Sequence, residues 1–336
     1  MKQKNYYFLK KIYNYVILST DKTVVNIIKN TGGIMENRFE LLNKLKKEKN
    51  AVILAHYYTS DDVQKAADYV GDSYFLSEKA REVKEDIIVM CGVSFMGESV
   101  KLLNPDKTVL LPDKTADCPM AHMADVKKIK EVRKKYDDVA VVCYVNSTAE
   151  LKAHSDVCVT SANALKIVKK LPEKNIFFIP DRHLAHYISG KVPEKNFIFN
   201  EGWCHVHNSL TENEVINLKN RYPEAEILVH PECRSEIVEM GDFVGSTSGI
   251  INYASKSSKK DFIICTEQGV LYELKEKNPD KNFYFPKEKF MCTDMKKITV
   301  DKIIETLKNN NYEVELNKNL IENACRPLEN MLKLAE

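Results

Sequence analysis

The sequence predicts an α/β protein made of three homologous three-layer α/β/α domains with short parallel sheets, arranged around a pseudo-threefold axis. Three observations lead to this prediction: apolar strands alternate with helical segments, the alternation recurs every 86 to 88 residues, and every repeat ends on a cysteine. The chain of 336 residues is also longer than a single hydrophobic core usually requires.

The first 34 residues do not fit this repeat. Lysines and tyrosines interrupt their apolar run and no small-residue cleavage site follows, so we do not expect a secretory signal. Met35 directly precedes ENRFELLNKLKKEKN, which has the periodicity of an amphipathic helix. We therefore interpret residues 1–34 as an N-terminal extension that can be disordered.

Two polar positions mark the first half of each repeat. The segments AVILAHYYTS, VAVVCYVNST and AEILVHPECR each begin as an apolar strand and end in polar residues; a helix, a second strand and a further helix follow. The marker pairs are His56 and Ser73, Tyr144 and Ser161, and His230 and Thr247. Both markers shift by 88 residues and then by 86, so the repeat is real rather than a chance similarity.

The second half of each repeat supplies a third strand, a helix and a fourth strand that leads to a cysteine. Cys118, Cys204 and Cys292 stand 62, 60 and 62 residues after the first marker of their repeats. The predicted domains are residues 35–122, 123–210 and 211–297, and the helical segment 298–336 is expected to pack on the first domain.

The repeat places chemically useful side chains at one end of each sheet. In parallel sheets ligands bind beyond the carboxyl ends of the strands, where the markers and the cysteines fall. If the three carboxyl ends face a common axis, the side chains converge on one central site.

Three cysteines at one axis favour a metal centre. Nine cysteines without a CxxC pair or an export signal indicate reduced thiols, not disulfides or a zinc ribbon. Structural zinc prefers four protein ligands, whereas a [4Fe-4S] cluster held by three cysteines keeps one iron open to substrate.

The marker hydroxyls and the strand-end pairs suggest how substrate binds and reacts. Ser73, Ser161 and Thr247 either cap helices or bind anions at helix N-termini, and three such positions imply a substrate with several carboxylate or phosphate groups. The pairs at alternate strand-end positions can supply general acids and bases. These pairs are His56 with Tyr58, Tyr144 with Asn146, and His230 with Glu232. His207, three residues after Cys204, can support the metal centre or the substrate.

Composition excludes other classes of function. The net charge of +2 and the absence of long single-sign runs do not favour nucleic acid or an anionic membrane as partner. The apolar runs are far shorter than the ~20 residues that span a bilayer, so we expect a soluble cytoplasmic protein.

From about Asn37 to its end, the sequence resembles the quinolinate synthase family. The motifs that carry this resemblance are AHYY with GDS, MCGVSFMGE, ADCPM, CYVNS with TSANA, IPDRHLA, EGWCHVH, HPEC, GSTSG, TEQGVLYEL and FMCTDMKKIT. The family usually has asparagine where this chain has Tyr57, a side chain expected to face away from the matching residues His56 and Tyr58.

The resemblance implies an enzyme of de novo NAD biosynthesis. Such enzymes condense iminosuccinate, made by a separate aspartate-oxidising enzyme that this chain could contact transiently, with dihydroxyacetone phosphate to give quinolinate, phosphate and water. It implies a [4Fe-4S] cluster on Cys118, Cys204 and Cys292, and the hydrolysable imine leads us to expect that the domains close over the site. The implied catalytic residues are Tyr58, His230 and Glu232. With His207 added, the predicted substrate-binding residues are His56, Ser73, Tyr144, Val145, Asn146, Ser161, His207, His230, Pro231, Glu232 and Thr247.

Two other functions compete with this interpretation. An iron-sulfur electron carrier would use the same cysteines but needs no surrounding acids and bases. A sugar-phosphate binding protein would use the helix N-termini, with the cysteines as ordinary core residues.

Overall fold

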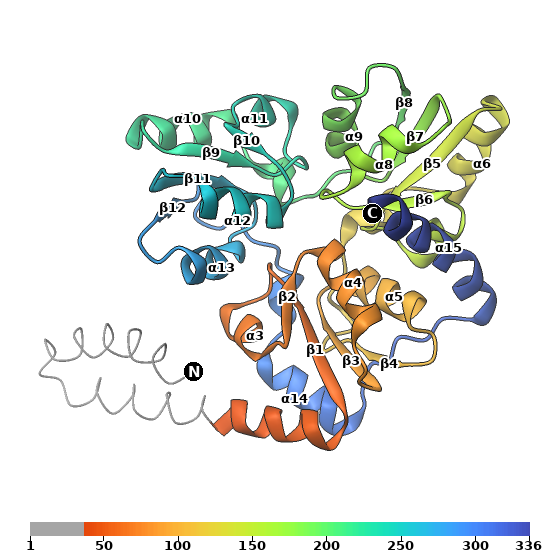
Figure 1. The fold of residues 1–336 in the computed structure, drawn as a ribbon, viewed down its shortest axis with the longest axis vertical. Helices are drawn as coiled ribbons and strands as arrows, with labels where there is room; N and C mark the ends of the chain where they lie inside the picture. Colours follow the sequence, from red (N-terminus) through yellow and green to blue (C-terminus); the bar gives the residue numbers. More distant parts are fainter. Residues whose placement is uncertain (1–36) are drawn as a thin grey trace, which may run out of the picture.

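The structure, a computed structural model, describes residues 37–336 and contains three four-stranded sheets (Figure 1). All strand pairings are parallel, and in each sheet the strands lie in the order second, first, third, fourth. The predicted α/β class with three repeated sheets is confirmed. The expected extension at residues 1–34 lies outside the described residues.

Repeat 1 follows a helical segment at residues 37–48. Its elements are β1 (Ala51–His56), α3 (Asp61–Ala66), β2 (Tyr69–Gly71), α4 (Ser73–Glu82), β3 (Ile87–Cys91), α5 (Ser94–Leu103), β4 (Thr108–Leu110) and the short 3-10 helix η1 (Pro119–His122).

Repeat 2 has the same order of elements with one more helix in front. Its elements are α6 (Val126–Lys135), β5 (Val139–Tyr144), α7 (Ala149–Ala153), β6 (Val157–Val159), α8 (Ala164–Lys170), β7 (Asn175–Ile179), α9 (Arg182–Ser189), β8 (Asn196–Phe199) and η2 (His207–Ser209).

Repeat 3 copies this arrangement. Its elements are α10 (Glu212–Arg221), β9 (Glu226–Val229), α11 (Ser235–Glu239), β10 (Phe243–Val244), α12 (Thr247–Lys256), β11 (Asp261–Cys265), α13 (Val270–Lys277), β12 (Asn282–Tyr284) and η3 (Met295–Lys297).

The first strand of each repeat is held by the same aspartate contact. β1 and β5 are buried along their whole length, as continuous apolar strands covered on both faces should be. The carboxylates of Asp68, Asp156 and Asp242 accept the backbone N–H groups of Ile53, Val141 and Ile227 at 2.8, 2.7 and 2.8 Å. These aspartates are separated by 88 and 86 residues, so the repeat extends to a hydrogen bond that the marker residues did not include.

The C-terminal segment joins two repeats. α14 (Val300–Asn309) packs against α3 and β3 of repeat 1, the domain on which residues 298–336 were expected to pack. α15 (Lys318–Ala335) instead contacts α7, β6 and α8 of repeat 2 as well as α5 of repeat 1. It therefore lies across the junction of the first two lobes (Figure 1).

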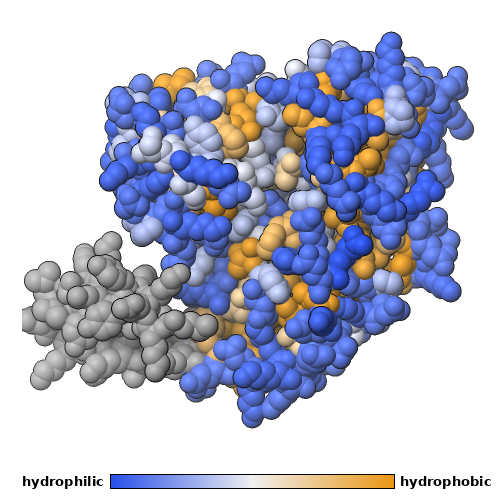
Figure 2. Space-filling model, in the orientation of Figure 1, coloured by the Kyte–Doolittle hydropathy of each residue, from blue (hydrophilic) through white to orange (hydrophobic). Residues whose placement is uncertain are grey.

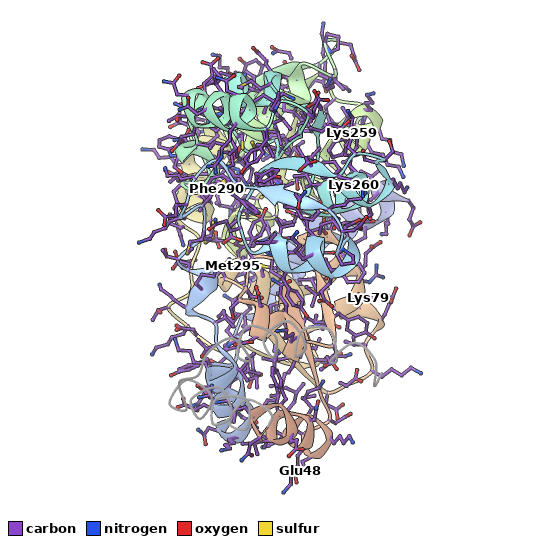
Figure 3. The ribbon with its side chains drawn as sticks, turned by 90° about the vertical axis from the view of Figure 1, so that its left-hand side faces the viewer. Glu48, Lys79, Lys259, Lys260, Phe290 and Met295 are labelled. Atoms are coloured by element: carbon purple, nitrogen blue, oxygen red, sulfur yellow. The ribbon has the colours of Figure 1, made fainter. Side chains whose placement is uncertain are left out.

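The hydrophobic core is divided unequally. One continuous core includes residues of repeats 1 and 2 together with α14 and α15, whereas repeat 3 has separate cores on the two faces of its sheet. Figure 2 shows hydrophilic residues over the outer surfaces of the lobes and apolar residues toward the junctions. Figure 3 places buried Phe290 in repeat 3, above Met295. No helix within residues 37–336 combines the length and apolar character needed to cross a bilayer.

Repeats 1 and 3 make close backbone contact at Gly269. A Cβ atom there would lie 2.6 Å from the Tyr57 carbonyl oxygen and 2.7 Å from the Tyr58 Cα atom, neither of which can move away cheaply. We expect Gly269→Ala to lower the free energy of unfolding by about 1 to 3 kcal/mol, measured by urea denaturation. Gly190→Ala is the control, because the nearest atoms to its Cβ would be at an ordinary 3.7 Å. Equal stability of both variants would contradict the prediction.

Candidate active site

One central cavity collects most of the predicted site residues from all three repeats. It opens where the carboxyl ends of β1, β5 and β9 face one another. The predicted residues that line it are His56, Tyr58, Ser73, Cys118, Tyr144, Asn146, Ser161, Cys204, His207, His230, Glu232, Thr247 and Cys292. Of the predicted residues, Val145 and Pro231 are absent from this lining.

The cavity brings the three repeat-terminal cysteines together. Cys118, Cys204 and Cys292 are free cysteines of intermediate residue exposure, whereas Cys91 and Cys233 are buried. Burial raises the pKa of Cys118 above its usual value, and nearby Cys292 raises it further. Burial likewise raises the pKa of Cys204, followed by the effects of Glu232 and Cys118. Thiolates this close repel one another unless a cation or metal neutralises them, so the donor set fits a metal centre.

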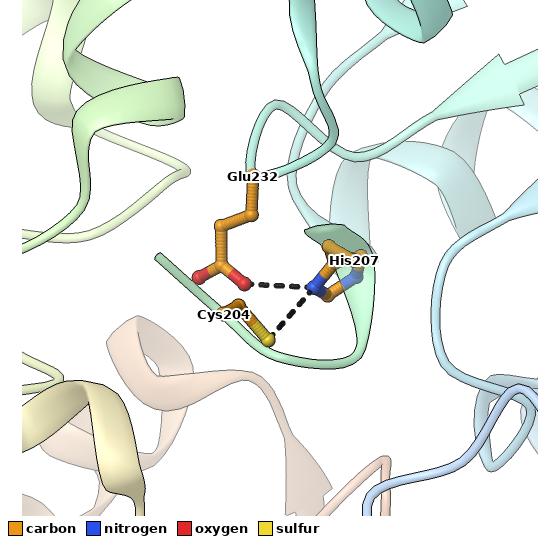
Figure 4. A group of neighbouring side chains, drawn as sticks. All are labelled: Cys204, His207 and Glu232. Atoms are coloured by element: carbon orange, nitrogen blue, oxygen red, sulfur yellow. Dashed lines mark hydrogen bonds and ion pairs between the residues drawn. The ribbon is translucent and has the colours of Figure 1, made fainter. Parts of the chain in front are cut away.

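Cys204 is joined to the carboxylate of Glu232 through an imidazole (Figure 4). His207 Nδ1 lies 3.3 Å from Cys204 Sγ and 2.8 Å from Glu232 Oε2. One ligand atom from each residue lies within 4.8 Å of the others, which is also a possible site for a single metal ion. His207 Nε2 lies 3.0 Å from the Thr266 hydroxyl, which fixes the plane of the ring.

Glu232 is the buried anion of the site. The Tyr144 hydroxyl donates to Glu232 Oε1 at 2.5 Å, while His207 contacts the other oxygen. Burial alone would raise the pKa of the Glu232 carboxyl, but His207, His230 and the Tyr144 hydrogen bond outweigh it and hold the pKa below its usual range. Burial, followed by the Glu232 charge, raises the pKa of Tyr144 well above 10, so its phenol keeps its proton.

Tyr58 connects repeat 1 to repeat 3 inside the cavity. Its hydroxyl lies 2.8 Å from both Thr247 Oγ1 and Thr266 Oγ1. Burial raises its pKa well above the usual value, and the Glu232 charge acts in the same direction. Tyr58 is thus a neutral hydroxyl in a relay of hydroxyl groups that ends at His207.

The two marker histidines have the same hydrogen bond in different repeats. Nδ1 of His56 accepts the backbone N–H of Tyr58 at 3.1 Å, and Nδ1 of His230 accepts that of Glu232 at 3.3 Å. In each ring Nδ1 is an acceptor, so a neutral ring carries its proton on Nε2. His230 Nε2 lies 3.3 Å from Ser161 Oγ. Burial lowers the pKa of both histidines to about 3, partly offset by Glu232.

These two pKa values predict a pH-dependent stability. Between about pH 6.5 and 3, His56 and His230 are protonated in the unfolded chain but neutral in the folded protein, so the free energy of unfolding rises with pH. For the metal-free protein we expect each histidine to contribute a slope approaching about 1.4 kcal/mol per pH unit, measured by urea unfolding between pH 6.0 and 5.0. His56→Asn should remove one such contribution.

Gly190→Ala removes no titratable group and is the control for this experiment. This variant should keep the slope of the parent protein. A slope that His56→Asn leaves unchanged would contradict the neutral, buried state of His56.

The three marker hydroxyls do not cap helices. Asp72 and Ser246 cap α4 and α12, because their side chains accept the N–H groups of Phe75 and Gly249. The residue before α8 is Asn163, so Ser161 lies in the turn ahead of that helix. The capping alternative for Ser73, Ser161 and Thr247 is therefore wrong. Their hydroxyls line the cavity instead.

The cavity also contains residues to which the sequence analysis assigned no role. Glu267 and His205 line it, and Thr266 bonds to two of its residues. Glu267 lies within the quoted motif TEQGVLYEL, two residues after the third strand of its repeat. An alignment of the repeats at their third strands could have identified it.

Tyr57 packs away from the central cavity. Only 6% of its surface is exposed, and it belongs to a core of repeat 3 with Ile250 and Ile251. Its hydroxyl bonds to Ser248, the second residue of α12. The residue that differs from the usual asparagine thus contributes to the contact between repeats 1 and 3.

The sequence was compared with known proteins. A profile of the family described as quinolinate synthetase A protein matches residues 40–333. A protein of Clostridioides difficile named quinolinate synthase is 54% identical over 88% of this chain and 97% of its own length. Proteins with the same name from Fusobacterium nucleatum and Aquifex aeolicus are 53% and 48% identical; each match covers 88% of this chain and 98% or 93% of the relative.

Proposed function

The chain belongs to the quinolinate synthetase A family and is an enzyme of that family, and from this we propose that it condenses iminosuccinate with dihydroxyacetone phosphate. The products would be quinolinate, phosphate and water. The observation that best supports the proposal is the convergence of three cysteines and six strand-end side chains, drawn from all three repeats, on one cavity.

The donor set fits a [4Fe-4S] cluster on Cys118, Cys204 and Cys292. The three cysteines line one cavity, and after burial Cys292 raises the pKa of Cys118 and Cys118 contributes to raising that of Cys204, as expected where a metal centre would neutralise thiolates. Bound by three thiolates, such a cluster keeps one iron without a protein ligand and so supplies a Lewis acid to the cavity.

The helix ends and hydroxyls would bind the anionic groups of the substrates. Ser73 and Thr247 are the first residues of α4 and α12, whose N-terminal N–H groups carry partial positive charge. Asn146 Oδ1 is buried without a hydrogen-bond partner and lines the cavity, so a substrate donor can satisfy it. The Nε2 atoms of His56 and His230 can donate to a carboxylate or a phosphate.

Glu232 and Tyr58 would carry the proton transfers. Glu232 stays ionised at neutral pH and can accept a proton. His207 and Tyr144 already contact its two oxygens and so hold the carboxylate in place. Tyr58 stays protonated and can donate, with Thr247 and Thr266 able to reorient around it. One buried anion beside one buried neutral acid is the pairing that an elimination requires.

Anaerobic iron and sulfide analysis combined with a quinolinate assay tests the proposal. We expect about four irons and four sulfides per chain, and quinolinate when both substrates are supplied. Zinc without sulfide would favour a single ion at Cys204, His207 and Glu232 and overturn the cluster. A colourless protein that binds sugar phosphate would favour a binding protein. A cluster whose spectrum does not change when a dicarboxylate analogue is added would favour an electron carrier.

A further inference from the structure

Each of the three cavity cysteines has its backbone N–H bonded to a carboxylate. The donor and acceptor pairs are Cys118 with Asp117 Oδ1 at 2.8 Å, Cys204 with Asp181 Oδ2 at 3.2 Å, and Cys292 with Glu267 Oε1 at 2.9 Å. Because the same hydrogen bond occurs at the cysteine of all three repeats, it is not an incidental contact of one loop.

Two of these carboxylates occupy equivalent positions in the repeat. Asp181 and Glu267 both stand two residues after the third strand, β7 or β11. The equivalent residue of repeat 1 is Val93, and there the acceptor is instead Asp117, which also accepts the Ser94 hydroxyl. Repeat 1 thus keeps the contact to its cysteine although it lacks the acid after β3.

The positions of Asp181 and Glu267 are costly ones for an acid. Both side chains are fully buried, and a buried carboxylate destabilises a fold unless several donors satisfy it. Asp181 divides its two oxygens: Oδ1 caps α9 by accepting the N–H of Leu184 at 2.7 Å, and Oδ2 accepts from Cys204. Capping needs one oxygen only, so the second serves the cysteine.

Glu267 is similarly divided. Oε2 accepts the N–H of Gly269 at 2.6 Å, while Oε1 accepts that of Cys292 and lies 3.0 Å from Lys296 Nζ. Lys296 also donates to the Tyr58 carbonyl at 2.6 Å. The orientation of Cys292 is therefore coupled to the strand end that carries Tyr58.

We propose that Asp181 and Glu267 are positioning residues that fix the peptides of Cys204 and Cys292, so that these thiols meet Cys118 in the geometry a metal centre requires. The inference rests on the cluster of the proposed function. A loop cysteine whose N–H is free can rotate its peptide and redirect its side chain. The carboxylate prevents this rotation, and it also keeps the N–H from bonding to a cluster sulfur, a contact that raises the reduction potential.

Asp181→Ser is the most informative variant. The serine hydroxyl can still cap α9 but cannot also reach Cys204, so capping is separated from the support of the cysteine. Asp181→Asn and Glu267→Gln each keep one acceptor oxygen and serve as the conservative variants. Asp242→Ser is the control, because Asp242 also accepts a backbone N–H, but its donor is Ile227 of β9 and not a cavity cysteine.

The measurements are the rate of iron loss to a chelator and the midpoint potential of the cluster, on the full anaerobic protein. We expect Asp181→Ser and Glu267→Ala to lose iron about 10- to 100-fold faster than the parent and to shift the potential upward. The Asn and Gln variants can bond to the cysteine N–H only with their single acceptor oxygen and at the expense of the other donor, so they should lose iron more slowly than these two variants but faster than the parent. Asp242→Ser should match the parent.

Each outcome decides between the two proposals. If the parent protein contains no iron and sulfide, both the proposed function and this inference are wrong. If the parent protein contains the cluster but Asp181→Ser and Glu267→Ala have its rate of iron loss and its midpoint potential, only this inference is wrong. If both of these variants fail to fold, the acids are structural and the positioning role is overturned.

Discussion

Replacement of Cys204 by serine is expected to remove the proposed [4Fe-4S] cluster. Cys204 is the cysteine in closest contact with the acid-base residues, through His207, and a serine hydroxyl is a poor ligand for iron in place of a thiolate. Iron should fall from about four atoms per chain to near zero, the brown colour should disappear, and quinolinate formation should stop.

Cys233→Ser is the control for this experiment. Cys233 is fully buried in the core of repeat 3, and its thiol donates to the Cys265 carbonyl at 3.4 Å, a bond that a serine hydroxyl can make. We expect this variant to keep its iron. Equal iron in both variants, or loss from Cys233→Ser only, would contradict the ligand set.

Tyr58→Phe should separate chemistry from metal binding. It removes one hydroxyl from between Thr247 and Thr266 and leaves all three cavity cysteines unchanged. If Tyr58 transfers a proton, kcat should fall about 10²- to 10⁴-fold while the iron content stays that of the parent. The two threonine hydroxyls lose a partner, so the free energy of unfolding should also fall by about 1 to 3 kcal/mol.

Tyr187→Phe provides the comparison, since Tyr187 is a half-buried tyrosine of α9 that does not line the central cavity. Its turnover should equal that of the parent. Parental turnover in Tyr58→Phe would refute the proton-transfer role, and loss of iron from that variant would make Tyr58 a support of the metal centre instead.

The sheets could be predicted because their signals are local. The strands are short runs of apolar and β-branched residues. The helices between them begin and end near polar residues, which can be identified from the sequence alone. The convergence of the cysteines could also be predicted, because parallel sheets place all their strand ends on one edge and the repeat supplies three such edges.

What could not be predicted are the contacts between repeats. Tyr57 is an aromatic residue beside a strand end, and nothing in its local sequence pattern indicates that it packs into a core of repeat 3. The acids Asp181 and Glu267 resemble ordinary helix-start residues in sequence, because capping alone explains an acid before a helix. Their second hydrogen bond, to a cysteine more than 20 residues away, appears only in three dimensions.

The unequal division of the core has a consequence for how the molecule opens. Repeats 1 and 2 share one core and α15 joins them, so they should exchange amide hydrogens as one cooperative unit. Repeat 3 has its own cores and should act as a second unit. It is attached to repeat 1 through Tyr57, Tyr58 and Gly269, and to repeat 2 through Leu210 and the hydrogen bond from Tyr144 to Glu232. Thr247, His230 and Glu232 belong to this second unit and line the central cavity. Movement of repeat 3 away from the other two repeats would therefore separate these side chains from Tyr58 and Tyr144, and its return would bring them together again.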